Sequence, residues 1–142
     1  MKVSAKTEYA CIAMLELSAS YPTDEPVRIR KIAEEHGIPS RFLVQILLQL
    51  KGAGLVVSTR GAAGGYQLAK PPEEITLAEV MNVTEGPDEE VTISAAPGSV
   101  VAKVLESAWR EVAEVHKKML EKITFDQLVE RAQHQSENMY YI

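Results

Sequence analysis

An arginine and two glutamines recur at four-residue intervals, as Arg41, Gln45 and Gln49. In an α-helix this spacing keeps the three side chains on one face. A guanidinium can bridge O6 and N7 of guanine, and a carboxamide can bridge N6 and N7 of adenine. The face is therefore suited to reading base edges in the major groove of double-stranded DNA, and we expect Arg41 and Gln45 to be the main base readers.

Four further residues carry groups that suit the DNA backbone. Ser40 has a hydroxyl at the expected start of the same helix, where free amides and the helix dipole favour a phosphate. Arg28 stands at the start of the preceding helix and suits a second phosphate. Lys2 and Lys6 lie near the start of the chain, where they either reach the flanking backbone or are only solvated.

Two apolar residues flank the reading face. Val44 is placed to touch a thymine methyl group. Phe42 fits two interpretations equally well, as part of this face or as part of the core.

Arg60 precedes a run of small residues, Gly-Ala-Ala-Gly-Gly at 61–65. No large side chain is near enough in sequence to bury it, and glycines allow a backbone to approach a ligand closely. Narrow A·T-rich minor grooves concentrate negative potential and attract an inserted arginine. We therefore expect Arg60 to enter a minor groove, the alternative being a solubilising charge on a hairpin.

Apolar periodicity predicts three helices early in the chain, at 4–19, 28–36 and 39–52. Gly37 ends the second helix because glycine accepts the left-handed conformation found at helix ends. Ser40 is expected to cap the third helix. The second and third helices, joined by a tight turn, form a helix-turn-helix pattern. The buried stripe of the third helix is expected to consist of Leu43, Ile46, Leu47 and Leu50.

A β-hairpin is expected next, because residues 55–60 and 66–69 are strand-forming runs around the glycine-rich segment. A helix-turn-helix followed directly by a hairpin is the winged-helix arrangement. Thr76 and Glu79 have the spacing of a capping box for one further helix. We expect residues 1–86 to form a winged helix-turn-helix DNA-binding domain, in a fold that is mainly α with a small β-hairpin.

A long helix is expected after a polar loop at 87–98. Residues 99–122 lack Gly and Pro, and their apolar residues alternate at intervals of four and three, which is a heptad seam. A helix of this length extends about 35 Å, more than its own domain needs. We expect it to pair with a second copy of the chain, the alternative being an amphipathic helix that lies on its own domain. The seam residues are Val101, Leu105, Ala108, Val112, Val115 and Met119.

A second capping box, formed by Thr124 and Gln127, predicts a short terminal helix through Leu128 and Val129. Residues 99–142 are therefore expected to comprise the dimerisation helix and a short C-terminal helix.

Several motifs match one protein family in order along the chain. They are Lys2-Val3-Ser4 with Tyr9-Ala10, Ile-Ala-Glu-Glu-His-Gly-Ile at 32–38, the segment 50–56, and above all Arg-Gly-Ala-Ala-Gly-Gly-Tyr-Gln-Leu at 60–68. Together they resemble the Rrf2 family of bacterial transcription regulators. The resemblance implies a homodimer whose two winged-helix heads bind an imperfect palindrome in promoter DNA. A repressor is the expected role, and an effector is expected that the sequence does not identify.

The chain departs from that family in its cysteines. The best-known members hold an iron–sulfur cluster with three cysteines in the loop before the long helix, whereas residues 91–101 contain none. The single cysteine, Cys11, falls within the first helix and is expected in the core. Because thiolates hold such clusters, we expect no iron–sulfur cluster and no other cofactor or metal.

The other potential metal ligands favour ordinary surface roles. Asp88, Glu89 and Glu90 are consecutive acids in a polar loop and are expected to be solvated. The histidines fall on different expected elements, at the surface or in packing. They are His36, His116 and His134.

Charge is divided unevenly along the chain, whose formal net charge is −5. Residues 1–70 carry nine Lys and Arg against six Asp and Glu, and residues 71–142 carry six against fourteen. A basic first half is consistent with an anionic partner.

Other classes of protein fit less well. One cysteine excludes disulfide scaffolds and zinc ribbons, and no apolar run approaches the roughly 20 residues that a membrane span needs, so we expect a cytoplasmic protein without a membrane partner. An enzyme is not indicated, because the sequence shows neither a nucleophile with a neighbouring base nor a phosphate-binding loop. A winged helix that binds only proteins is the remaining alternative.

Overall fold

The computed structural model describes residues 2–87, 90–94 and 97–140. In these ranges the chain folds into helices and one antiparallel hairpin, so the expected fold class is confirmed. The elements in chain order are α1 (Ala5–Ser20), the 3₁₀ turn η1 (Tyr21–Thr23), α2 (Ile29–His36), α3 (Ser40–Gly52), β1 (Val56–Thr59), β2 (Gly65–Leu68), the 3₁₀ turn η2 (Pro72–Glu74), α4 (Leu77–Glu85), α5 (Val100–Lys122) and α6 (Phe125–Tyr140).

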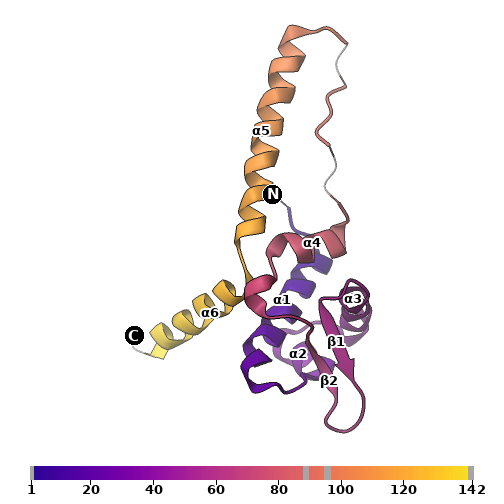
Figure 1. Cartoon of the computed structure of the whole chain (residues 1–142), viewed down its shortest axis with the longest axis vertical. Coiled ribbons are helices and arrows are strands. Elements are labelled where there is room, and N and C mark those ends of the chain that lie inside the picture. The colour runs from indigo at the N-terminus through magenta and orange to yellow at the C-terminus, as the bar shows by residue number, and fades with distance from the viewer. Residues whose placement is uncertain (1, 88–89, 95–96, 141–142) are drawn as a thin grey trace.

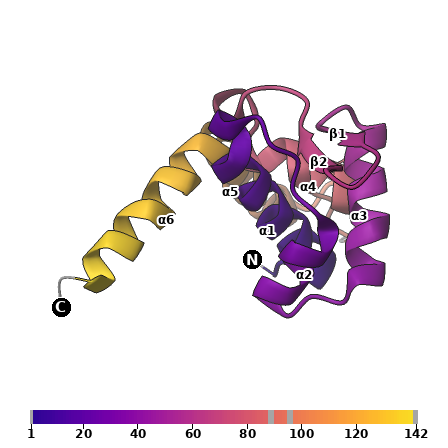
Figure 2. The ribbon, with the colours of Figure 1, turned by 90° about the horizontal axis from the view of Figure 1, so that it is seen from below.

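Figure 1 shows a compact head, made of α1 to α4 and the hairpin, from which α5 rises as a single rod. The 90° turn of Figure 2 shows α6 pointing away from the head, with α3 and the hairpin on the opposite side. Within the described ranges, no helix combines the length and the apolar character that crossing a membrane requires. The expected reading helix, α3, and the long helix with the heptad seam, α5, therefore belong to separate parts of the molecule.

One apolar core holds the head together, and it includes a residue from far along the chain. The predicted stripe of α3 is buried to 3% exposure or less. Phe125, at the start of α6, is fully buried in the same core. Its N–H donates to the carbonyl of Ile75 at 3.0 Å, and the N–H of Leu77 donates to the carbonyl of Ile123 at 3.0 Å. The start of α6 is thus part of the head.

The hairpin has a third backbone partner that the sequence patterns did not predict. β1 and β2 pair antiparallel, with Val56 opposite Leu68. Val27, just before α2, exchanges two hydrogen bonds with Tyr66, at 2.9 and 2.8 Å. This pairing ties the hairpin to the start of the helix-turn-helix.

The hairpin formed by β1, β2 and the residues between them is the wing of this fold. Two of its glycines are required by the hairpin's own backbone. A side chain at Gly65 would collide with the backbone of Val27, and one at Gly64 would collide with the carbonyl oxygen of Thr59. Gly61 has open space around it, and its φ of 103° favours glycine. Close approach within the protein therefore accounts for Gly64 and Gly65 without any ligand.

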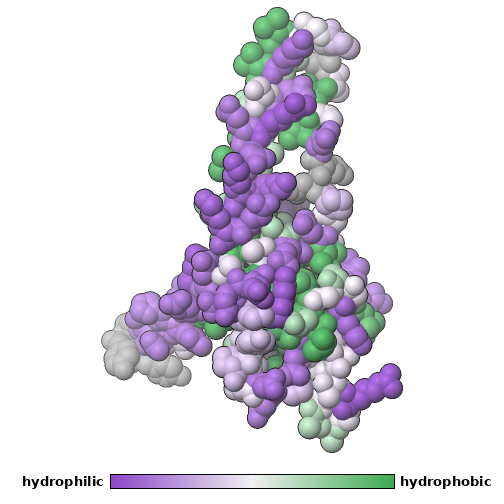
Figure 3. All heavy atoms as spheres, in the orientation of Figure 1, coloured by the Kyte–Doolittle hydropathy of each residue, from purple (hydrophilic) through white to green (hydrophobic). Residues whose placement is uncertain are grey.

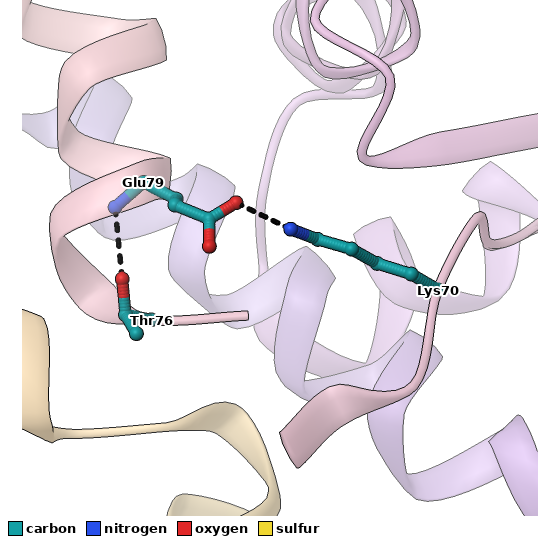
Figure 4. A network of polar contacts seen from close by, with 3 residues as sticks. All are labelled: Lys70, Thr76 and Glu79. Carbon is teal, nitrogen blue, oxygen red and sulfur yellow. Dashed lines mark hydrogen bonds and ion pairs between the residues drawn. The ribbon is translucent and has the colours of Figure 1, made fainter. Parts of the chain in front are cut away.

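The two predicted capping boxes form to different extents. Thr124 Oγ1 accepts from the N–H of Gln127 at 3.3 Å, and Gln127 Oε1 accepts from the N–H of Thr124 at 3.2 Å, which completes the box. Thr76 Oγ1 accepts from the N–H of Glu79 at 3.2 Å, but the Glu79 carboxylate accepts from Lys70 Nζ at 2.8 Å (Figure 4). The charged partner is favoured over a backbone amide because ionic hydrogen bonds are stronger.

Two expectations about helix ends are wrong. Ser40 does not cap α3: the N-cap is Pro39, which has no side-chain oxygen, and Ser40 is the first helical residue. The terminal helix is not short, since α6 continues for 16 residues to Tyr140. Residues 125–140 contain neither Gly nor Pro, so no helix breaker ends it after Val129.

Candidate nucleic-acid interface

The outer face of α3 is the surface that points away from the apolar core. The turn before it is closed by Gly37, which has a φ of 64°, as the sequence predicts. The helical repeat places Arg41, Gln45 and Leu48 opposite the buried stripe, and all three are exposed. Leu48 was missed as a surface residue, although its position seven residues after Arg41 puts it in the same row.

Arg41 and Phe42 lie against each other on this surface. The Arg41 guanidinium carbon is 5.1 Å from the centroid of the Phe42 ring, which is a cation–π contact. Phe42 is 47% exposed, so the structure places it on the reading face rather than in the core. Val44 is 41% exposed on the other side of Arg41.

One edge of the outer face adjoins α1. Gln45, Gln49 and Phe42 line a cavity of about 490 Å³ together with Lys6 and other α1 residues. The structure thus brings Lys6 beside both predicted glutamine readers. Lys2 precedes α1 and is exposed.

A hydrogen-bond network fixes the N-terminal end of α1, the helix that forms one side of that cavity. Ser4 caps α1 by accepting from the N–H of Thr7 at 3.2 Å, and it donates to the carboxylate of Glu85 at the end of α4. Thr7 Oγ1 donates to the same carboxylate at 2.5 Å and shares a hydrogen bond with Thr84 at 2.7 Å. The Ser4 hydroxyl, followed by that of Thr7, lowers the pKa of Glu85 below its usual value by stabilising the charged form.

The other edge of the outer face adjoins the wing. Lys51 Nζ, at the end of α3, donates to Ser58 Oγ of β1 at 2.7 Å. Arg60 follows β1 directly and is exposed, with no ion-pair partner among the described residues. Lys51 therefore helps to orient the hairpin that carries Arg60.

A basic recess separates α2 from the wing tip. Arg28 and Lys31 line a cavity of about 400 Å³ together with one acid, Glu25, and with Ala63 and Gly64 of the wing. Arg28 is the N-cap residue of α2, and both cations are exposed. Lys31 was not singled out from the sequence, although it lies three residues after Arg28 and hence on the same side of the helix. Ser40, the predicted phosphate ligand, is exposed at the start of α3.

The heptad seam of α5 is open to solvent. None of its residues is buried: exposure reaches 79% at Val101 and is still 49% at Leu105. Val104 and Trp109, at 66% and 52%, widen the apolar surface beyond the six predicted positions. In the view of Figure 3, α5 shows a mostly hydrophilic face, with hydrophobic atoms at its upper end and edges. The alternative in which α5 lies on its own domain is therefore wrong.

The cysteine of this chain does not fit a thiolate-ligated iron–sulfur cluster. Cys11 is half-buried within α1, where it packs against the core of the head. Burial raises the pKa of its thiol to about 11. Such clusters are held by several thiolates, whereas this chain has a single cysteine.

One group of potential metal ligands occurs among the described residues. The ligand atoms of Glu16, Glu35 and His36 lie within 4.8 Å of one another, a proximity across α1 and α2 that the sequence did not predict. His36 Nε2 is 2.8 Å from Glu16 Oε1, so a hydrogen bond accounts for the proximity of these two side chains, and Glu35 precedes His36 in the chain.

Known proteins match this chain over nearly its whole length. Residues 3–131 match the Rrf2 family, which is described as comprising iron-dependent transcriptional regulators. The transcriptional regulator CymR of Bacillus subtilis is 30% identical over 143 residues, covering all of both chains. The regulator IscR of Pectobacterium carotovorum is 32% identical over 91% of this chain and 79% of its own.

Solved structures agree with this assignment. The structure of CymR, the global cysteine regulator of B. subtilis, matches with a TM-score of 0.80 at 30% identity, over 92% of this chain and 98% of that one. IscR of T. potens matches with a TM-score of 0.75 at 32% identity, over 95% and 91%. These relatives are regulators with helix-turn-helix domains rather than enzymes. The chain belongs to the Rrf2 family of DNA-binding transcription regulators.

Proposed function

We propose that two copies of this chain bind a palindromic promoter site and repress transcription. α3 enters the major groove, where Arg41 and Gln45 contact base edges, and the wing inserts Arg60 into the adjacent minor groove. The observation that carries the proposal is the position of the outer face of α3 between Lys6 on its α1 edge and the wing on the other. Cations on both edges suit a groove whose two walls are lined with phosphates.

Ser40 and the Arg28–Lys31 recess supply the remaining backbone contacts. Ser40 lies at the N-terminal end of α3, where the dipole and free amides favour an anion even though its side chain does not cap the helix. Arg28 and Lys31 face the wing tip across the same recess and suit one phosphate between them. Gln49 and Lys2 extend the contact along the α1 edge.

The dimer is formed by α5. The apolar stripe of α5, from Val101 to Met119, contains no buried residue, and pairing it with a second copy would remove it from water. Two heads joined in this way would present two copies of α3 to two half-sites, about 34 Å apart for successive turns on one side of the duplex.

The regulator works without an iron–sulfur cluster. This part of the proposal is supported by the presence of one cysteine, half-buried within α1, where such clusters need several thiolate ligands. An effector of another kind controls DNA binding, and the Ser4–Thr7–Glu85 network offers a route, because it joins the start of α1 to the helix that leads toward α5. Because its partner is promoter DNA, we place the protein in the cytoplasm.

Fluorescence anisotropy with the full chain and labelled duplexes tests the function. We expect log affinity to fall linearly with log salt concentration, a preference of about a thousand-fold or more for the specific palindrome over its scrambled version, and two chains per duplex. Affinity that does not respond to salt would instead support the protein-binding alternative. Binding of one chain per palindrome would refute the dimeric arrangement.

A further inference from the structure

The reading face of α3 carries more apolar surface than its folding explains. The core side of the helix is supplied by four buried residues. Opposite them, Val44 is 41% exposed and Leu48 is 55% exposed, one helical turn apart. A single exposed leucine needs no explanation, but two aliphatic side chains in line with Arg41 form a continuous apolar strip.

Arg41 is drawn away from this strip. Its guanidinium lies 5.1 Å from the Phe42 ring centroid, and Phe42 belongs to the α1 edge of the face. The polar readers Gln45 and Gln49 line the cavity on that same edge. The centre of the face and its wing edge are therefore left to Leu48 and Val44.

The surroundings of the strip indicate what covers it. Arg41 precedes it on α3, Lys51 lies in the last turn of the same helix, and Lys6 borders the opposite edge. A family that binds DNA and a cationic border both favour a duplex as the occupant. On a major-groove base edge, the apolar group is the 5-methyl of thymine, whereas the other edges offer hydrogen-bond donors and acceptors.

We infer that Leu48 and Val44 read the 5-methyl groups of thymines, so that this regulator recognises its site through methyl contacts as well as hydrogen bonds. The inference rests on the proposed placement of α3 in the major groove. Four helical residues rise about 6 Å, and base pairs are spaced at about 3.4 Å. The two thymines are therefore expected about two base-pair steps apart in each half-site.

Single thymine-to-deoxyuridine replacements test this directly, because they remove one methyl group and leave every hydrogen bond in place. The probe is the palindrome selected from random duplexes by the full chain. For wild-type protein we expect affinity to fall about fourfold at each of two positions per half-site, as for the loss of one buried methyl group. Replacements elsewhere in the site should have no effect.

Variants assign each methyl group to a side chain. In Leu48→Ala and in Val44→Ala, the ratio of affinities for thymine and uracil should fall to about one at one of the two positions and stay near four at the other. Val57→Ala is the matched control, because Val57 is 46% exposed on β1 rather than on α3; it should keep both ratios. Val44→Thr keeps the branched shape should Val44→Ala fold poorly, and it should weaken the same ratio.

The inference is overturned if wild-type protein binds the palindrome with the expected salt dependence but does not distinguish uracil from thymine. That result would leave the proposed function standing, whereas failure to bind any duplex would remove both. The inference is also overturned if both α3 variants keep full discrimination. A change in oligomeric state with unchanged discrimination would show that the strip contacts protein instead.

Discussion

Thr7 Oγ1, on α1, donates a hydrogen bond of 2.5 Å to the carboxylate of Glu85, the last residue of α4. Thr7 is 1% exposed, so this contact lies at the inner side of α1, beneath the surface that carries Lys6. It couples the start of the helix beside the candidate DNA interface to the connection that leads to α5.

Glu85→Gln should lower the melting temperature at pH 7, because a charged acceptor makes stronger hydrogen bonds than an amide. The pKa of Glu85 is lowered in the folded protein, so its contribution is present above the unfolded pKa of about 4.3 and is lost as pH falls through the folded value. Thermal melts from pH 3 to 8 should therefore show the difference closing at acid pH. Glu74→Gln, at an exposed acid of η2, is the control and should show no such pattern.

Val112→Asp should abolish the proposed dimer. Val112 is 58% exposed in the middle of the apolar stripe of α5, and a buried aspartate pair without counter-ions would be strongly unfavourable. Light scattering should give the mass of one chain, with the helical circular dichroism of the head retained. Ser107→Asp places the same charge off the stripe and should remain dimeric. A dimer of unchanged stability in Val112→Asp would contradict the role given to α5.

Arg41→Ala should reduce specificity. Loss of a bidentate guanine contact costs about 1–3 kcal/mol on the specific site and much less on random DNA. Affinity for the specific and the scrambled duplex, measured at several salt concentrations, checks this. Equal losses on both duplexes would mean that Arg41 holds the backbone, and the reading role would pass to Gln45 or Gln49.

Arg60→Ala should weaken binding to A·T-flanked sites and make the salt dependence shallower by about one unit per lost contact. An arginine in the minor groove responds to groove width and electrostatic potential more than to base identity. The ratio of specific to scrambled affinity should therefore change less than it does for Arg41→Ala. A salt slope identical to that of wild-type protein would place Arg60 outside the interface.

Cys11 should react slowly with thiol reagents at pH 7, since its pKa of about 11 leaves little thiolate. Alkylation of the native protein should be much slower than alkylation of the unfolded chain.

Protein purified without oxygen should be colourless, because we expect no iron–sulfur cluster. A brown preparation with stoichiometric iron and sulfide would show that carboxylate or histidine ligands replace cysteines.

Local patterns were sufficient for most of the elements. The spacing of Leu43, Ile46, Leu47 and Leu50 predicted the buried side of α3, and Gly37 predicted its preceding turn. The absence of helix breakers and the heptad spacing predicted α5, which the structure places at Val100–Lys122. These features depend on backbone geometry and on residues within a few positions of one another, which is the information that a sequence carries directly.

Contacts between distant segments were decided only by the tertiary structure. Val27 could not be assigned to the hairpin, because nothing in its neighbours specifies pairing with Tyr66, and Phe125 gave no sign of entering the core of the head. The sequence also predicted one outer face of α3, but not its surroundings. In the structure Gln45 and Gln49 lie beside α1, whereas Val44 and Leu48 lie on the part of the face that is not next to α1. Helical periodicity determines which side chains point outward, but the packing of neighbouring elements determines what each of them lies against.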